Sequence, residues 1–292
     1  MTIPLPILGG LGAAVSWAIS SLVSARASRL TGAPVTVAGA MLVGFVLLIP
    51  VALLTVPDPL PAADALVIPT LAGAANIAGL LLAYTAYRVG AVGVVSTICS
   101  TEGAIAAVFA VVAGERMAPG TGPILGVLAV GVAMAAAGGG KEIEEGVPIG
   151  RARSLRAAGL AALAATMFGT GLFLTGRASG TLPLPWLLLP ARVIGTLLVG
   201  VPLLLFARGR LVRAAIPYIV TCGIVEVTGF TAFAIGARTD IATTSVLASM
   251  FAPLAAVAAY VLFRERLARP QVAGIAVVVA GVALLGATGV GG

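Results

Sequence analysis

Ten apolar stretches of about 20 residues alternate with short polar or turn-forming segments along the whole chain. An α-helix needs about 20 apolar residues to cross the hydrocarbon core of a bilayer, so each stretch predicts one transmembrane helix. The predicted spans are residues 4–24, 34–56, 65–87, 91–113, 121–139, 156–177, 184–207, 213–236, 240–262 and 269–289. The pattern therefore predicts an all-α integral membrane protein.

The second half of the chain repeats the first with an offset of 150 residues. Residues 245–286 align with residues 95–136, and this register places Glu265 on Glu115. Each copy holds five spans, and because five is an odd number, the second copy enters the membrane from the opposite side. We therefore expect ten transmembrane helices arranged as two five-helix inverted-topology repeats. The predicted divisions are 1–140 for the first repeat, 141–156 for a polar linker and 157–292 for the second repeat.

Composition strengthens the membrane assignment. Hydrophobic residues make up 60% of the chain, charged residues make up 9%, and the mean hydropathy is +1.16, which is more than a soluble core needs. The net charge of +7 would suggest a nucleic-acid partner in a soluble protein, but here the basic residues lie singly or in small groups between the spans. We therefore expect membrane lipid, and no nucleic acid, as the partner of this surface.

The basic residues also predict the topology. The loops on one side of the membrane carry 13 Lys and Arg residues, and those on the other side carry 3. By the positive-inside rule the basic side is cytoplasmic, which leaves both termini outside. Residues 1–10 lack the positively charged start of a cleavable signal peptide, so we expect the first span to remain as a membrane helix.

Several kinds of chemistry are disfavoured by the residues that the sequence lacks. The chain has no histidine, and its two cysteines, Cys99 and Cys222, both fall inside predicted spans. A metal site or a disulfide framework is therefore not expected. No phosphate-binding loop ending in GK[ST] is present, and no nucleophile is paired with a base. We expect no cofactor, no direct use of ATP and no enzymatic activity.

Four polar residues lie near the middle of predicted spans, namely Asn76, Glu102, Arg192 and Glu226. A charged residue at the bilayer centre costs roughly 2.5–3.5 kcal/mol, so these groups must face one another or water. Asn76 and Glu226 are 150 residues apart and occupy equivalent positions in the two repeats. Polar groups at equivalent positions indicate the midplane between the repeats, where inverted-repeat transporters bind substrate.

Helical spacing adds aromatic side chains to this candidate site. Phe230 and Phe233 share a helix face with Glu226, while Tyr87 lies on the face of Asn76 and Tyr84 at its margin. A carboxylate beside aromatic rings suits an organic cation or an amphipathic metabolite.

Two interpretations of the buried charges remain open. Desolvated carboxylates at Glu102 and Glu226 would bind and release protons during a transport cycle. Alternatively, Arg192 and Glu226 form a buried ion pair, bridged by Asn76, that serves helix packing alone.

Each repeat closes with a helix, a turn that contains GE or RE, and a glycine-rich last helix. The residues that carry this pattern are Gly114, Glu115, Arg116, Gly126 and Gly131, then Ser249, Pro253, Arg264, Glu265, Arg266, Gln271, Gly274 and Gly281, with Trp17 in the first span. Over nearly its whole length the chain resembles the drug/metabolite transporter superfamily, in its EamA-type ten-helix group. It departs from that pattern at Glu102 and Gly103, where the family usually has a proline, and at Arg264, which replaces a glycine. Family members are commonly drawn with both termini in the cytoplasm, against the charge count here.

The resemblance implies a secondary transporter of the bacterial cytoplasmic membrane that moves small organic solutes, most often outward, by alternating access. Candidate solutes are amino-acid-like metabolites and organic cations, and protons are the candidate coupling ions. Spans 1, 3, 4, 6, 8 and 9 would line the cavity, with Trp17 in its wall, and the turns at Glu115 and Glu265 would be structural end caps. We expect a monomer or a weak homodimer. A lipid-linked flippase of the same superfamily and a membrane scaffold without transport are the alternatives.

Overall fold

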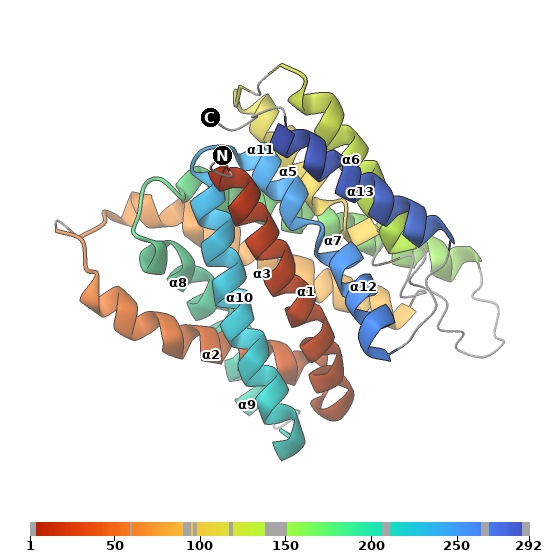
Figure 1. Cartoon of the computed structure of the whole chain (residues 1–292). Coiled ribbons are helices and arrows are strands. Elements are labelled where there is room, and N and C mark those ends of the chain that lie inside the picture. The colour runs from red at the N-terminus through yellow and green to blue at the C-terminus, as the bar shows by residue number, and fades with distance from the viewer. Residues whose placement is uncertain are drawn as a thin grey trace.

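The structure, a computed structural model, describes residues 4–58, 60–89, 95, 98–116, 119–137, 151–205, 211–263 and 269–287. Every regular element within these ranges is helical (Figure 1). The first half contains α1 (Leu5–Thr31), α2 (Ala33–Leu54), η1 (Ala63–Leu66), α3 (Val67–Val89), α5 (Glu102–Val112) and α6 (Thr121–Ala137). The second half contains α7 (Arg151–Ala178), α8 (Leu184–Gly195), η2 (Thr196–Gly200), α9 (Val201–Leu205), η3 (Arg213–Ala215), α10 (Ile216–Ala237), α11 (Ile241–Ala248), α12 (Phe251–Phe263) and α13 (Arg269–Ala287).

Helix length and composition agree with a membrane protein. Within the described residues, 6 helices are long and apolar enough to cross a bilayer. The shorter apolar helices are Glu102–Val112, Thr121–Met134, Ile241–Ala255 and Val272–Gly281, which fall in the fourth, fifth, ninth and tenth predicted spans. Large apolar side chains such as Leu54 and Val112 point outward, as a lipid-facing surface requires. The all-α membrane fold predicted from the sequence is therefore confirmed.

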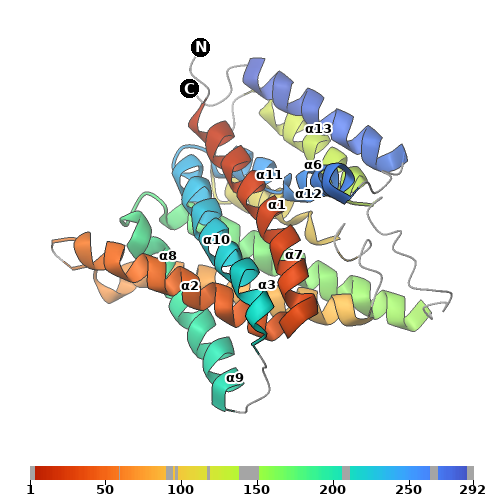
Figure 2. The same cartoon turned by 60° about the horizontal axis from the view of Figure 1, so that its bottom comes forward.

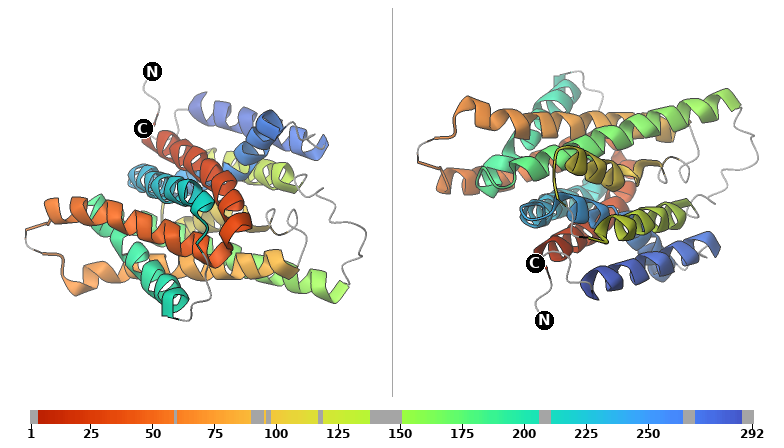
Figure 3. Two further views of the ribbon diagram at one scale, coloured as in Figure 1. Left: turned by 90° about the horizontal axis from the view of Figure 1, so that it is seen from below. Right: turned by 90° about the horizontal axis from the view of Figure 1, so that it is seen from above.

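The two repeats are interleaved, and their contacts occur in matched pairs. α1 packs along α10, and α3 packs along α7 (Figures 1 and 3). In the 150-residue register α1 corresponds to α7, and α10 corresponds to α3, so these are two copies of the same contact. The contacts of α1 with α12 and of α7 with α5 are related in the same way. The duplication seen in the sequence is thus a structural duplication.

Two other contacts join a helix to its own counterpart in the other repeat. These pairs are α6 with α13, and α2 with α8. Figure 2 shows α6 and α13 side by side at one edge of the bundle. Helices that pair with their own counterparts lie around the axis that relates the repeats. α5 and α11 also pack together, although the counterpart of α5 in the register is α12.

The fourth and ninth spans are interrupted. A turn at residues 249–250 separates α11 from α12, and a turn at residues 100–101 precedes α5. Pro253 accounts for the break in the second repeat, because its ring displaces the carbonyl group four residues earlier, at Ser249. The two turns lie at equivalent places in the register to within one residue. Broken helices at equivalent places are typical of transporters built from inverted repeats.

The breaks correct the prediction of continuous helices over residues 91–113 and 240–262 in the parts of those spans that the structure describes. The seventh predicted span, 184–207, is one continuous apolar helix over Leu184–Leu203, although a π-helical segment, η2, lies between α8 and α9. A π turn beside Pro202 accommodates the hydrogen bond that this residue cannot donate.

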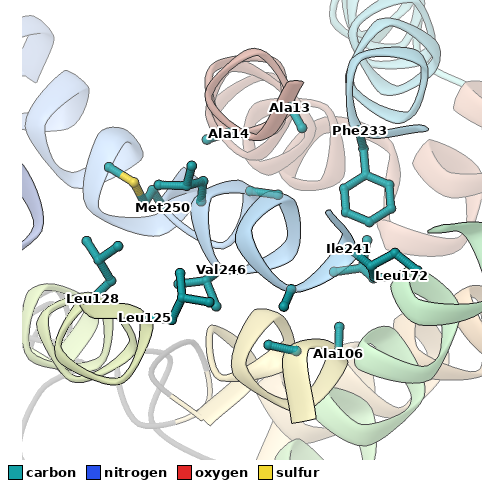
Figure 4. Packing of buried hydrophobic residues seen from close by; sticks show 14 of the residues in the cluster. Ala13, Ala14, Ala106, Leu125, Leu128, Leu172, Phe233, Ile241, Val246 and Met250 are labelled. Carbon is teal, nitrogen blue, oxygen red and sulfur yellow. The ribbon is translucent and has the colours of Figure 1, made fainter. Parts of the chain in front are cut away.

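The main hydrophobic core surrounds α11, all of whose residues are buried. Figure 4 shows side chains from neighbouring helices converging on this short helix. They include Ala13 and Ala14 from α1, Phe233 from α10, Leu172 from α7, Ala106 from α5, and Leu125 and Leu128 from α6. An interrupted helix therefore lies at the centre of the bundle, held by helices of both repeats.

Candidate functional site

Glu226 lies in the middle of α10 on the face that meets α1. Its Oε1 accepts a hydrogen bond from Ser20 Oγ of α1 at 2.7 Å, and the same hydroxyl lies 3.4 Å from Cys222 Sγ, one turn earlier on α10. The two helices approach closely because Gly229 has no side chain; a Cβ atom there would lie 2.6 Å from Trp17 Nε1. The sequence predicted Glu226 and Trp17 for this site but did not single out Ser20.

Arg192 of α8 is buried, and no carboxylate of the described residues forms a salt bridge with it. Its side chain is 2% exposed, Nη1 donates to Met41 Sδ at 3.3 Å, and Nε has no hydrogen-bond partner. Its Cζ atom lies 5.4 Å from the centroid of the Phe230 ring. A thioether and an aromatic face are weak partners for a guanidinium group that can donate five hydrogen bonds. Arg192 therefore keeps donors free for another acceptor.

The ion pair of Arg192 with Glu226, which a purely structural role would favour, is not formed. Within the described part of the chain no salt bridge involves Arg192, although the charge of Glu226 acts on it electrostatically. Gly44 of α2 lies between the two regions, because a Cβ there would be 3.0 Å from Arg192 Cδ and 3.2 Å from Val227 Cγ2. The site thus holds opposite charges near each other but not in contact.

Aromatic rings form one wall beside these charges. The Trp17 ring contacts Phe230 edge to face with centroids 5.1 Å apart, and Phe233 at 6.2 Å. Trp17 Nε1 is buried without a hydrogen-bond partner. Phe230 is half-buried, whereas Phe233 is 0% exposed and belongs to the core around α11. Phe230 is therefore placed to meet a ligand, and Phe233 supports the wall from behind.

Glu102 is the first residue of α5 and directly follows the turn at residues 100–101. The side chain is 8% exposed, no described residue hydrogen-bonds its carboxylate, and the charge of Glu226 acts on it. The next residue, Gly103, touches α11: a Cβ there would lie 2.7 Å from Ser249 Oγ and would overlap the Ser245 carbonyl oxygen. The break in each repeat therefore packs against the other, and it positions a buried carboxylate beside the site.

The structure places Asn76 on a different pair of helices. Asn76 is half-buried on α3, its backbone lies against Gly171 of α7, and its side chain makes no hydrogen bond to any described residue. α3 packs mainly on α7 and α8, whereas α10 packs mainly on α1 and α2. The equivalent positions Asn76 and Glu226 therefore lie at different helix–helix interfaces. The side chains of Tyr84 and Tyr87 lie outside what the structure describes.

This combination defines a class of protein. Two interleaved repeats of apolar helices, interrupted at equivalent places, enclose buried charges that lack full protein partners; soluble proteins and simple membrane anchors have no need of such a site. The chain is a multi-pass membrane protein with a polar site between its repeats.

The chain belongs to the EamA-like transporter family. The family profile matches twice, over residues 4–137 and 155–287, once in each repeat. The fold is also similar to that of several solved structures; in one crystal structure the TM-score is 0.75 at 16% sequence identity, covering 97% of this chain and 96% of the other, and this likeness concerns the fold alone. No curated protein matches the chain. Family membership establishes a membrane transporter of small solutes.

Proposed function

We propose that the protein is a secondary transporter that exports small amphipathic solutes, amino-acid-like zwitterions or organic cations, across the bacterial cytoplasmic membrane by alternating access. The family supports transport, and the sequence has no nucleotide-binding loop that would supply energy from ATP. The single observation that carries the solute class is Arg192, which is 2% exposed and whose Nε has no partner. A buried guanidinium with free donors suits a carboxylate ligand.

The surroundings of Arg192 fit the other parts of such a solute. Glu226 is a carboxylate with one hydrogen bond, from Ser20, and can accept an ammonium group. Trp17 and Phe230 offer aromatic surface for an apolar body. A solute that carries both charges would form the hydrogen bonds that Arg192 and Glu226 leave unmade. An analogue that lacks one of the charged groups would leave one of these side chains unpaired, so the site would reject it.

Glu102 supplies a candidate for proton coupling. It is buried close enough to Glu226 for their charges to interact, and no described residue neutralises it. Glu102 is buried and Glu226 is half-buried, and a proton bound at Glu102 would remove the repulsion between the two carboxylates when the site is empty. An ammonium group at Glu226 would displace that proton, so solute export would exchange with proton entry.

The experiment is a flux assay in proteoliposomes with the full chain. We expect a zwitterionic amino acid with an apolar side chain to move at least about 10-fold faster than its decarboxylated amine or its deaminated acid, because each missing charged hydrogen bond costs about 1.5–3 kcal/mol. Imposing a proton gradient accelerates this flux in the wild type, and the acceleration is lost in Glu226→Gln. Equal rates for all three compounds contradict the zwitterion proposal, and no flux of any compound contradicts transport of this class.

The charge bias of the loops supports an orientation with both termini outside. Under this proposal a cysteine introduced at Asp58 labels with a membrane-impermeant maleimide in intact cells, whereas one at Arg210 labels only after the membrane is permeabilised. The control is the unmodified chain, in which Cys99 and Cys222 are both buried. The reverse pattern would place the termini in the cytoplasm, and labelling of both sites from one side contradicts the ten-span arrangement.

A further inference from the structure

A second polar cluster lies where the turn after α5 meets the start of α11, outside the spans and away from Arg192. Gly114, with φ at +95°, turns the chain after α5 so that the Glu115 side chain reaches the other repeat. Glu115 Oε1 accepts hydrogen bonds from the backbone N–H groups of Ile241 at 2.6 Å and Ala242 at 3.3 Å. A residue of the first repeat therefore caps a helix of the second.

The same helix start already has a cap of its own. Asp240 Oδ1 accepts from the Thr243 backbone N–H at 2.7 Å, and Oδ2 accepts from the Thr243 hydroxyl at 2.6 Å. The second oxygen of Glu115, Oε2, is buried without a donor, and the Asp240 carboxyl group lies within hydrogen-bonding reach of Glu115. Two carboxylates repel each other at such a distance unless they share a proton.

The pair is open to water on one side. A cavity of about 240 Å³ lies beside it, lined by residues from the ends of α5, α7 and α10 and from the start of α11. The charged groups that face Glu115 from these elements are Asp240, Arg177 and Arg238. Arg238 is held elsewhere, since its Nε donates to the Ser179 carbonyl oxygen at 2.8 Å, and Arg177 is exposed. Neither arginine forms a salt bridge with Glu115 in the described part of the chain, so neither neutralises the two acids by direct contact.

The equivalent positions of the other repeat differ in sequence. In the 150-residue register Glu265 corresponds to Glu115, but Gly90 stands where the second repeat has Asp240. The sequence therefore lacks a second carboxylate at the position equivalent to Asp240, and Glu265 offers a matched control.

We propose that Glu115 and Asp240 share one proton when this end of the protein is closed, and that release of the proton to the adjacent cavity loosens the contact between the repeats. When the proton leaves, both acids carry full negative charge and repel each other across the interface. The contact is then a pH-sensitive latch at one mouth of the transporter. It is independent of which solute the central site binds.

The direction of the pH effect follows from the environment of Glu115. Burial, followed by the hydrogen bond and charge of Asp240, raises the pKa of Glu115 from 4.5 to about 7, against the opposing effect of the Ala242 and Ile241 N–H groups. Because the folded protein holds this proton more tightly than the unfolded chain, the stability gained is full below the unfolded value and is lost as pH rises through about 7.

The test is the melting temperature of the purified full chain in detergent between about pH 5 and about pH 8.5. We expect that of the wild type to fall by about 2–4 °C over this range, with the midpoint of the fall near pH 7. Glu115→Gln and Asp240→Asn replace the shared proton by an amide N–H, so the fall disappears in both. Glu265→Gln keeps the wild-type fall. A fall that persists in both amide variants, or that disappears in Glu265→Gln as well, overturns the proposal.

A second measurement reports opening directly and does not depend on the melting data. Ala237 lines the cavity and is 3% exposed, so a cysteine there reports access to the repeat interface. We compare maleimide labelling of Ala237→Cys with and without Glu115→Gln. The pH dependence of the thiol itself is common to both backgrounds and cancels in the ratio of rates. We divide the labelling rate measured with Glu115 present by the rate measured with Glu115→Gln. This ratio is expected to be near one at about pH 5 and to rise severalfold at about pH 8.5. A ratio that stays constant with pH contradicts opening.

Discussion

Replacing Arg192 by methionine is expected to remove transport of carboxylate-bearing solutes without lowering the melting temperature of the protein. The methionine fills much of the same space in α8 but cannot donate a hydrogen bond. Flux of the zwitterionic solute should fall by about 10- to 100-fold, the value of one charge-assisted interaction of about 1.5–3 kcal/mol, while flux of the decarboxylated amine is retained. The measurement is paired flux of the two compounds in proteoliposomes.

The melting temperature separates this expectation from a structural role. The guanidinium group is buried with an unpartnered Nε and with Met41 as its hydrogen-bond acceptor, so its desolvation is poorly compensated. Removing such a charge leaves stability unchanged or raises it, as is common for groups retained for function. If Arg192 instead held the helices together, its loss would lower the melting temperature and reduce flux of both compounds equally.

The control for this pair of measurements is Arg213→Met. Arg213 lies in η3 and is exposed, so its replacement removes one positive charge without touching the site. Flux of both compounds and the melting temperature should match the wild type. An equal loss in this control would show that net charge, and not the buried guanidinium, determines the effect.

The sequence predicted the large-scale organisation well because lipid imposes a direct rule on it. A helix in a bilayer must be apolar over its whole length, so the spans and the 150-residue register can be read from hydropathy alone. The register also identified Glu226 as a site residue, since a charge in the middle of a span has few explanations. The contacts of α1 with α10 and of α3 with α7 then follow from the duplication, although no sequence feature named those partners.

The helix breaks could be predicted only in part. The ninth span contains Pro253, a residue that bends or breaks helices, and the structure has a turn at residues 249–250, one turn earlier, because a proline acts on the carbonyl group four residues before it. The equivalent turn at residues 100–101 is not followed by a proline, because Gly103 stands at the position equivalent to Pro253. It depends on packing against the other repeat, which local sequence does not encode.

The prediction of the site residues was similarly limited, because helical periodicity shows which face a residue lies on but not which neighbour it contacts. Phe230 and Phe233 lie on neighbouring parts of one helix face, so spacing could not tell the ring beside Arg192 from the ring in the core. Ser20 gave little signal, because serines in membrane helices commonly bond to their own backbone. Its partner Glu226 lies 206 residues away in the chain. The separation of Arg192 from Glu226 depends on the side chains between them and could not be read from the sequence.

Replacing Gly103 by alanine is expected to destabilise the protein by about 1–3 kcal/mol, the usual cost of overpacking a tight core. The added Cβ would overlap the Ser245 carbonyl oxygen and lie 2.7 Å from Ser249 Oγ, and because the first of these is backbone, a side-chain rotation cannot relieve it. The crossing of α5 and α11 must therefore shift, and with it the break that positions Glu102. Both the melting temperature and the solute flux should fall.

The matched control is Gly126→Ala in α6, where a Cβ atom would meet nothing within 4 Å. That substitution should be neutral or slightly stabilising, since alanine favours a helix over glycine by about 0.5–1 kcal/mol. If Gly103→Ala behaved like this control, the helix break would not depend on close contact between the repeats. The missing proline in the first repeat would then need another explanation. The expected difference between two glycine-to-alanine changes in the same protein thus tests whether the crossing of α5 and α11, and not helix propensity, holds the two broken spans in place.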